Sequence, residues 1–201
     1  KPPLLAWIIA LVCSIFGNSI FVIKMISTLM YCVSSYVVFL ISKKLYNNHE
    51  LALLTSTSFF LMPAVSFSSF LISTDIVLIL FWSLALLQIL IIKEKPSTLN
   101  FILLGVFVGL AFLAKYAAIY FIFSMVFLLF EKTMRNAFFK NKLFLFYFVL
   151  VLVIVITPNI LWNIKNNWTT FEHTVNNAAL NRIDINFVES LKFIGSQIIM
   201  I

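Results

Sequence analysis

Two charged residues interrupt long apolar stretches of this sequence and are the first candidates for chemistry. Asp75 lies in Ile-Ser-Thr-Asp-Ile-Val-Leu, and Lys115 lies in Phe-Leu-Ala-Lys-Tyr-Ala-Ala. A lone charge at the centre of a membrane costs about 2.5–3.5 kcal/mol on insertion scales, so such residues usually line a cavity. A carboxylate there can act as a general base, metal ligand or hydroxyl binder, and a lysine can hold a phosphate. The structural alternative is that each side chain reaches the lipid headgroups, or that the two pair with each other.

Three further polar residues are weaker candidates. Lys1 precedes Pro2-Pro3 and the first apolar stretch. Proline suits the first turn of a helix, so the amine of Lys1 and the free backbone amides of that turn could hold a phosphate. Glu172 and His173 are adjacent in a polar stretch and could contribute to a polar or metal site. The structural alternatives are an interfacial anchor for Lys1 and an exposed polar surface for the Glu-His pair.

The composition identifies the environment of these candidates. Of the 201 residues, 63% are hydrophobic and only 10% are charged, and the mean hydropathy is +1.10. Soluble domains are about 45–50% apolar and about 25% charged, so a water-soluble domain is excluded, and so is disorder. The net charge is +7, but the sequence has no long basic run to carry a nucleic-acid site. We therefore expect an all-α, polytopic transmembrane helical bundle.

Short charged islands divide the chain into apolar blocks. The block Leu4–Phe16 is short for a membrane span and predicts a juxtamembrane or re-entrant helix within residues 1–18. Residues 162–190 predict an external loop, and residues 191–201 predict the start of a further helix. Residues 19–161 predict the transmembrane part, with apolar blocks at Ser19–Ile41, Leu51–Leu71, Thr74–Ile92, Leu99–Phe130 and Leu143–Leu161.

The basic loops predict the orientation of the bundle. Lys43-Lys44, Lys93/Lys95 and the segment 132–142 are all rich in lysine or arginine, which favours the cytoplasmic side. If all three loops lie on that side, Leu99–Phe130 must cross the membrane twice and fold back near Lys115. The count is then about six transmembrane helices plus the short first helix. The same parity places Asp75 and Lys115 together at the outer face.

One pattern predicts how two helices pack. Gly105 and Gly109 form a GxxxG sequence within an apolar block. Small residues at this spacing let the backbones of two membrane helices approach closely. We therefore expect another helix to pack against this face.

Several stretches, taken in order, carry a resemblance to a known family. They are Lys-Pro-Pro-Leu-Leu-Ala-Trp from Lys1, Phe-Gly-Asn-Ser from Phe16, Ser-Lys-Lys-Leu-Tyr from Ser42, Ser-Thr-Asp ending at Asp75, the glycine-containing helix from Gly105 to Lys115, Pro-Asn-Ile-Leu-Trp-Asn from Pro158, and Phe-Glu-His-Thr from Phe171. Their order and spacing resemble the bacterial protein-mannosyltransferase-like glycosyltransferases of family 39. The aminoarabinose transferase that acts on lipid A belongs to the same wider group.

The resemblance implies a GT-C enzyme of the bacterial inner membrane, with several membrane passes and a periplasmic active face. Such an enzyme takes a sugar from a polyprenyl-phosphate carrier and gives it to a lipid, glycan or protein acceptor. It implies that Lys1 contacts the carrier phosphate, that Asp75 is the second acidic residue at the cavity mouth, and that Lys115 lines the same cavity. A divalent metal ion is a possible cofactor, although the resemblance identifies no ligand for it in this sequence.

The sequence departs from the family pattern at two places. The family's first acidic motif, which the resemblance implies would hold the base, precedes the lysine-proline stretch and so precedes Lys1. We therefore expect this chain to be the interior of a longer protein and inactive by itself. Many relatives have glycine after the lysine, whereas this chain has Tyr116 after Lys115, which puts the local backbone and the fit of the acceptor in question.

The leading hypothesis is a glycosyltransferase that uses Asp75 for catalysis and uses Lys1, Lys115, Glu172 and His173 to bind its substrates. One alternative is a transporter or lipid flippase with Asp75 and Lys115 as a charge relay. A transporter predicts an inverted internal repeat, and we find none in this sequence. Another alternative is a purely structural membrane subunit.

Overall fold

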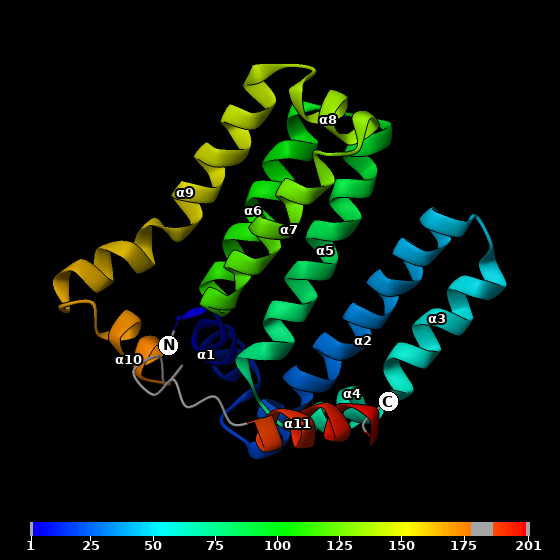
Figure 1. Cartoon of the computed structure of the whole chain (residues 1–201). Coiled ribbons are helices and arrows are strands. Elements are labelled where there is room, and N and C mark those ends of the chain that lie inside the picture. The colour runs from blue at the N-terminus through cyan, green and yellow to red at the C-terminus, as the bar shows by residue number, and fades with distance from the viewer. Residues whose placement is uncertain (1, 178–186, 200–201) are drawn as a thin grey trace.

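The computed structural model describes residues 2–177 and 187–199, and these residues form helices joined by short connections. The predicted all-α class is therefore confirmed. Figure 1 shows the elements, which are α1 (Leu4–Phe16), α2 (Ile20–Tyr46), α3 (His49–Leu61), α4 (Pro63–Ser68), α5 (Thr74–Glu94), α6 (Thr98–Ala114), the 3-10 turn η1 (Tyr116–Ala118), α7 (Ile119–Leu128), α8 (Lys132–Phe139), α9 (Lys142–Lys165), α10 (Thr169–Asn177) and α11 (Phe187–Ile199).

The first two helices end and begin where the sequence predicts. Gly17 follows α1 with a φ of +86°, a left-handed conformation that glycine adopts without steric cost. Ser19 then caps α2, because its side chain accepts a hydrogen bond from the backbone N–H of Val22 at 3.2 Å. The short first helix is therefore confirmed.

Among the described residues, fewer helices have the length of a full membrane span than the six transmembrane helices that the sequence predicts. Within the described residues, α2, α5 and α9 are long and apolar enough, and a fourth span exists if η1–α7 and α8 are counted together despite a bend of 108°. The other apolar blocks form shorter helices. The predicted span Leu51–Leu71 is divided at Met62-Pro63, where α3 ends and α4 begins with proline at its first position. Proline has no N–H to continue the preceding helix, so the break is local.

The predicted fold-back at Lys115 is confirmed. The helix α6 ends at Ala114, Lys115 is extended with φ −158° and ψ 137°, and η1 leads into α7. Helix α7 then runs back toward the end of the bundle that holds α8 (Figure 1). Tyr116 adopts ordinary 3-10 geometry, and the described residues with positive φ do not include it. The chain therefore turns here without glycine.

The described residues near the end of the chain contain two short helices, α10 and α11. The predicted external loop 162–190 contains the last turn of α9, the helix α10 and the first residues of α11. The polar composition of this segment does not predict these helices, because both loops and surface helices carry polar residues that face water. Residues 178–186 lie outside the described part of the chain.

The three basic loops meet at one end of the bundle, as predicted. Lys44 at the end of α2 pairs with Glu94 of α5 at 2.6 Å, and Lys93 pairs with Glu131 before α8 at 2.8 Å. Figure 1 shows α8 at this end and α1 and α10 at the other. Asp75 and Lys115 lie at the end with α1 and α10, opposite the basic loops.

The glycines of α6 lie against α9, which confirms the predicted close contact. A Cβ atom built on Gly105 would lie 2.7 Å from the carbonyl oxygen of Phe148, and one on Gly109 would lie 2.8 Å from Val155. Real side chains do not approach so closely. The two backbones are therefore packed at a distance that only glycine allows.

Replacing Gly105 by alanine is expected to destabilise the protein by about 1–3 kcal/mol, the range for overpacking a core. The added methyl group meets a backbone carbonyl, which cannot move aside unless α9 shifts. Thermal unfolding of the purified protein in detergent checks this loss. Gly195→Ala is the matched control, because a Cβ atom there has no atom within 4 Å. Equal losses for both variants would contradict the packing role of Gly105.

Candidate active site

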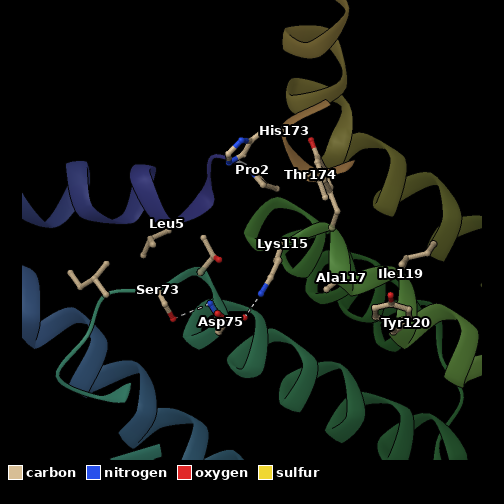
Figure 2. Close-up of a pocket in the computed structure, with 13 residues that line it drawn as sticks. Pro2, Leu5, Ser73, Asp75, Lys115, Ala117, Ile119, Tyr120, His173 and Thr174 are labelled. Atoms are coloured by element: carbon tan, nitrogen blue, oxygen red, sulfur yellow. Dashed lines mark hydrogen bonds and ion pairs between the residues drawn. The ribbon is translucent and has the colours of Figure 1, made fainter. Parts of the chain in front are cut away.

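A pocket of about 730 Å³ opens at the end of the bundle opposite the basic loops. Four parts of the chain form it (Figure 2): the start of α1, the connection from α4 to α5, the turn after α6, and α10. Its lining includes Pro2 and Leu5, Ile72 to Asp75, Lys115 to Ala117, Ile119 and Tyr120, and His173 and Thr174. The pocket therefore joins segments that are far apart in the sequence.

Asp75 and Lys115 meet in this pocket. The Nζ atom of Lys115 lies 2.5 Å from Oδ1 of Asp75, so the two side chains form a charge-assisted hydrogen bond (Figure 2). The pair joins the start of α5 to the end of α6. The two residues that the sequence singles out are thus one site.

Local structure places both side chains. Ser73 caps α5, and its Oγ accepts a hydrogen bond from the backbone N–H of Asp75 at 3.3 Å. This cap sets Asp75 in the first turn of the helix, where the partial positive charge of the helix end favours a carboxylate. Ile76 and Ala114, the chain neighbours of the two charged residues, are almost fully buried in one hydrophobic cluster. The packing of α5 on α6 therefore fixes the distance between the charges.

The pair is open to a ligand. The side chains of Lys115 and Asp75 are 45% and 52% exposed, so neither is sealed in the protein interior. An exposed ion pair contributes about 0–1 kcal/mol to stability. The two residues do pair with each other, as the structural alternative predicts. The pair nevertheless contributes little to the free energy of folding. Both groups also lie at one end of the bundle, which does not favour a relay across the membrane.

Comparison with known proteins places this arrangement in a family. Residues 1–162 match the family described as dolichyl-phosphate-mannose-protein mannosyltransferase, which is more than half of the chain. The chain belongs to this family. Its apolar helices and this GT-C glycosyltransferase family together make it a multi-pass membrane protein, and the predicted family is confirmed.

One curated relative matches nearly all of the chain. The chain is 30% identical over 199 residues to a protein of Rhizobium johnstonii (strain DSM 114642 / LMG 32736 / 3841) described as lipid A galacturonosyltransferase RgtD. The match covers 98% of this chain but 41% of that protein, so the chain spans about two fifths of the relative's length. No solved structure matches the chain significantly.

The other predicted site residues of this mannosyltransferase-family chain are divided among different places. His173 lines the pocket from α10, across from the Asp75–Lys115 pair. Glu172, its neighbour in sequence, is exposed on α10 and is not among the residues that line the pocket. The pocket meets the side of α10 that carries His173 and Thr174, and Glu172 projects from another side of the helix. Lys1 lies outside the described residues.

The described residues offer few ligands for a divalent metal ion. Within the described ranges, no three side chains of histidine, cysteine, aspartate or glutamate gather closely enough to hold a metal. The pocket lining contributes one carboxylate, Asp75, and one imidazole, His173. These two residues do not make a complete ligand set for a metal ion.

Sequence reasoning missed the polar surroundings of Lys115. Tyr116, Tyr120 and Thr174 all line the pocket, and none of them interrupts an apolar block with a charge. The signal that could have found two of them is their position in the sequence, because Tyr116 follows Lys115 directly and Thr174 follows His173.

A second hollow of about 470 Å³ adjoins the pocket and shares Pro2 and Thr74 with it, and its wall includes Trp7 and Trp162.

Proposed function

We propose that the chain is part of a membrane glycosyltransferase that transfers a sugar from a polyprenyl-phosphate carrier to an acceptor on the periplasmic face of the bacterial inner membrane. One observation carries the proposal. The Asp75–Lys115 pair lies in an open pocket at the end of the bundle opposite the basic loops. Basic loops favour the cytoplasm, so the pocket faces outward. The family and the relative's description support transfer of a sugar.

The pocket supplies two of the groups that the reaction needs. Lys115 exchanges its contact with Asp75 for an oxygen of the carrier phosphate and stabilises the negative charge of the leaving group. Asp75, and not a residue before Lys1, then serves as the base in this proposal and accepts the proton of the acceptor hydroxyl. The acceptor oxygen forms a bond to the anomeric carbon as the bond from that carbon to the phosphate oxygen breaks. The phosphate leaves with the electron pair, and the proton resides on the Asp75 carboxylate.

The neighbouring hollow suits the carrier chain. Trp7, Pro158 and Trp162 give it a largely apolar wall, and it opens beside the pocket at Pro2 and Thr74. A polyprenyl chain is insoluble in water and favours such a surface. The phosphate would then reach Lys115 while the chain stays in contact with apolar side chains and membrane lipid.

One vesicle experiment tests the donor and the face together. Sealed right-side-out vesicles that contain the full-length protein receive a short-chain polyprenyl-phosphate donor with a radiolabelled sugar, and a lipid acceptor. We expect transfer in these vesicles and little transfer in sealed inside-out vesicles until detergent opens them. The same sugar on a nucleotide should give no transfer. Transfer from the nucleotide sugar, but none from the polyprenyl phosphate, would reject the proposal.

A further inference from the structure

We propose that Tyr116 is a positioning residue that anchors α10 over the pocket and thereby places His173 and Thr174 against the donor sugar. This inference rests on the proposed function for the identity of the substrate. The anchoring itself follows from contacts that are independent of any reaction.

The hydroxyl of Tyr116 joins three segments of the chain. It donates a hydrogen bond to Oδ1 of Asn159 at 2.8 Å and accepts one from Nδ2 of Asn163 at 3.3 Å. It also lies 3.1 Å from the hydroxyl of Thr170. Asn159 and Asn163 belong to α9, and Thr170 belongs to α10. One phenol therefore connects the turn after α6 to both later helices.

The partners of Tyr116 form a closed polar cluster in an apolar setting. Asn163 is fully buried, and Asn159 and Thr170 are each 7% exposed. Oδ1 of Asn163 accepts hydrogen bonds from both the backbone N–H and the hydroxyl of Thr170. Buried polar groups are costly unless they are paired, so this cluster specifies one arrangement of the two helices.

The connection between α9 and α10 depends on this cluster. Asn167 and Trp168 both have positive φ values, 51° and 57°, in a region that residues other than glycine adopt at a cost. The backbone N–H of Trp168 donates to the carbonyl of Asn163 at 2.8 Å, which closes the turn. Such conformations persist when surrounding contacts hold them.

The ring of Tyr116 adds a second contact to the anchor. It stacks on Phe171 with the ring centres 4.6 Å apart and the planes within 17°. Phe171 also packs edge-on against Trp168 at 5.3 Å. The first turn of α10 is therefore held by its backbone, by a hydroxyl and by an aromatic ring.

The anchored turn determines what lines the pocket. Thr174 lies one turn after Thr170 and donates its hydroxyl hydrogen to the Thr170 carbonyl at 2.8 Å. His173 and Thr174 then face the pocket across from Lys115 (Figure 2). If Lys115 holds the phosphate, the sugar attached to that phosphate lies between the two walls. Hydroxyl and imidazole groups on α10 suit hydrogen bonds with sugar hydroxyls.

The test uses variants that remove one hydroxyl each from the full-length protein. Tyr116→Phe keeps the aromatic stack, and Thr170→Val keeps the shape of the side chain. Thr170→Ser restores the hydroxyl and serves as the rescue. Tyr36→Phe removes the hydroxyl from an exposed tyrosine of α2 and serves as the control. We expect Tyr116→Phe and Thr170→Val to raise KM for the polyprenyl-phosphate donor about tenfold, which corresponds to about one net hydrogen bond. The value of kcat per folded protein should change less than about twofold.

A distance measurement reports the anchor without any reaction. Spin labels at Val175→Cys on α10 and Leu143→Cys at the far end of α9, in a background without Cys13 and Cys32, give a distance distribution by electron paramagnetic resonance. We expect a narrow distribution in the parent, Thr170→Ser and Tyr36→Phe proteins, and a distribution at least twice as broad in Tyr116→Phe and Thr170→Val.

Each result decides a different part of the inference. A distribution that stays narrow in both hydroxyl-lacking variants would overturn the anchor. A broad distribution with an unchanged donor KM would overturn the placement of α10 against the sugar. If the parent protein transfers no sugar from the donor but the distributions still broaden, the anchor stands and the proposed function fails. A uniform loss of folded protein with unchanged KM would show a purely structural role and overturn the proposal.

Discussion

Replacing Asp75 by asparagine is expected to lower the rate of sugar transfer by about 10²- to 10⁴-fold, the range for loss of a general base. The amide oxygen can still accept a hydrogen bond from Lys115, but the amide cannot take the acceptor proton. Because the ion pair is exposed, stability should change by no more than about 1 kcal/mol. Initial transfer rates in proteoliposomes and thermal unfolding in detergent measure the two effects separately.

A matched control exists at the other end of the bundle. Glu131 pairs with Lys93 at 2.8 Å, and both side chains are about as exposed as those of the site pair. Glu131→Gln removes a carboxylate from an equivalent contact and should keep nearly the parent rate. An Asp75→Asn protein that transfers sugar at the parent rate would remove Asp75 from the catalytic step. If both variants lost transfer rate equally, the loss would come from a change in the fold and not from the catalytic step.

Replacing Lys115 by glutamine is expected to lower kcat by about 10²- to 10³-fold, the range for loss of one group that stabilises a developing negative charge. Glutamine keeps hydrogen-bonding ability but has no positive charge for the leaving phosphate. The loss should shrink with a donor whose leaving group is more acidic than polyprenyl phosphate, because such a group needs less stabilisation. Steady-state kinetics with the two donors make the comparison.

The control for Lys115 is Lys93→Gln. Lys93 also makes a single ion pair, but it lies among the basic loops, far from the pocket in the bundle. Its replacement should leave kcat nearly unchanged. A Lys115→Gln loss that is identical for both leaving groups would show that Lys115 does not act on the phosphate.

The sequence predicted those features that depend on neighbouring residues. Gly17 ends the first helix, and the charge at Lys115 divides an apolar block, as found. Hydropathy, capping and charge act within one or two turns of the chain, so a single sequence contains the necessary information.

Among the described residues, full-length spans are fewer than the predicted crossings, because some of the predicted crossings are short or broken helices. The block Leu51–Leu71 is apolar enough for a membrane, but Pro63 divides it into α3 and α4. The polar segment after Trp162 contains the helix α10, which its hydropathy alone does not indicate. Polarity alone did not show that Asn163 and Thr170 bond to each other and to Tyr116 and hold this helix in place.

The sequence by itself determined that this protein is a helical membrane protein, that its basic loops share one end, and that Asp75 and Lys115 share the other. These properties follow from side-chain hydropathy and from the parity of crossings. Only the tertiary structure decided that the two charges touch, that His173 joins them while Glu172 does not, and that Tyr116 ties α10 to the pocket. Those outcomes depend on contacts between residues that are 40 to 54 positions apart, and the packing of α5, α6 and α9 sets which of those residues meet.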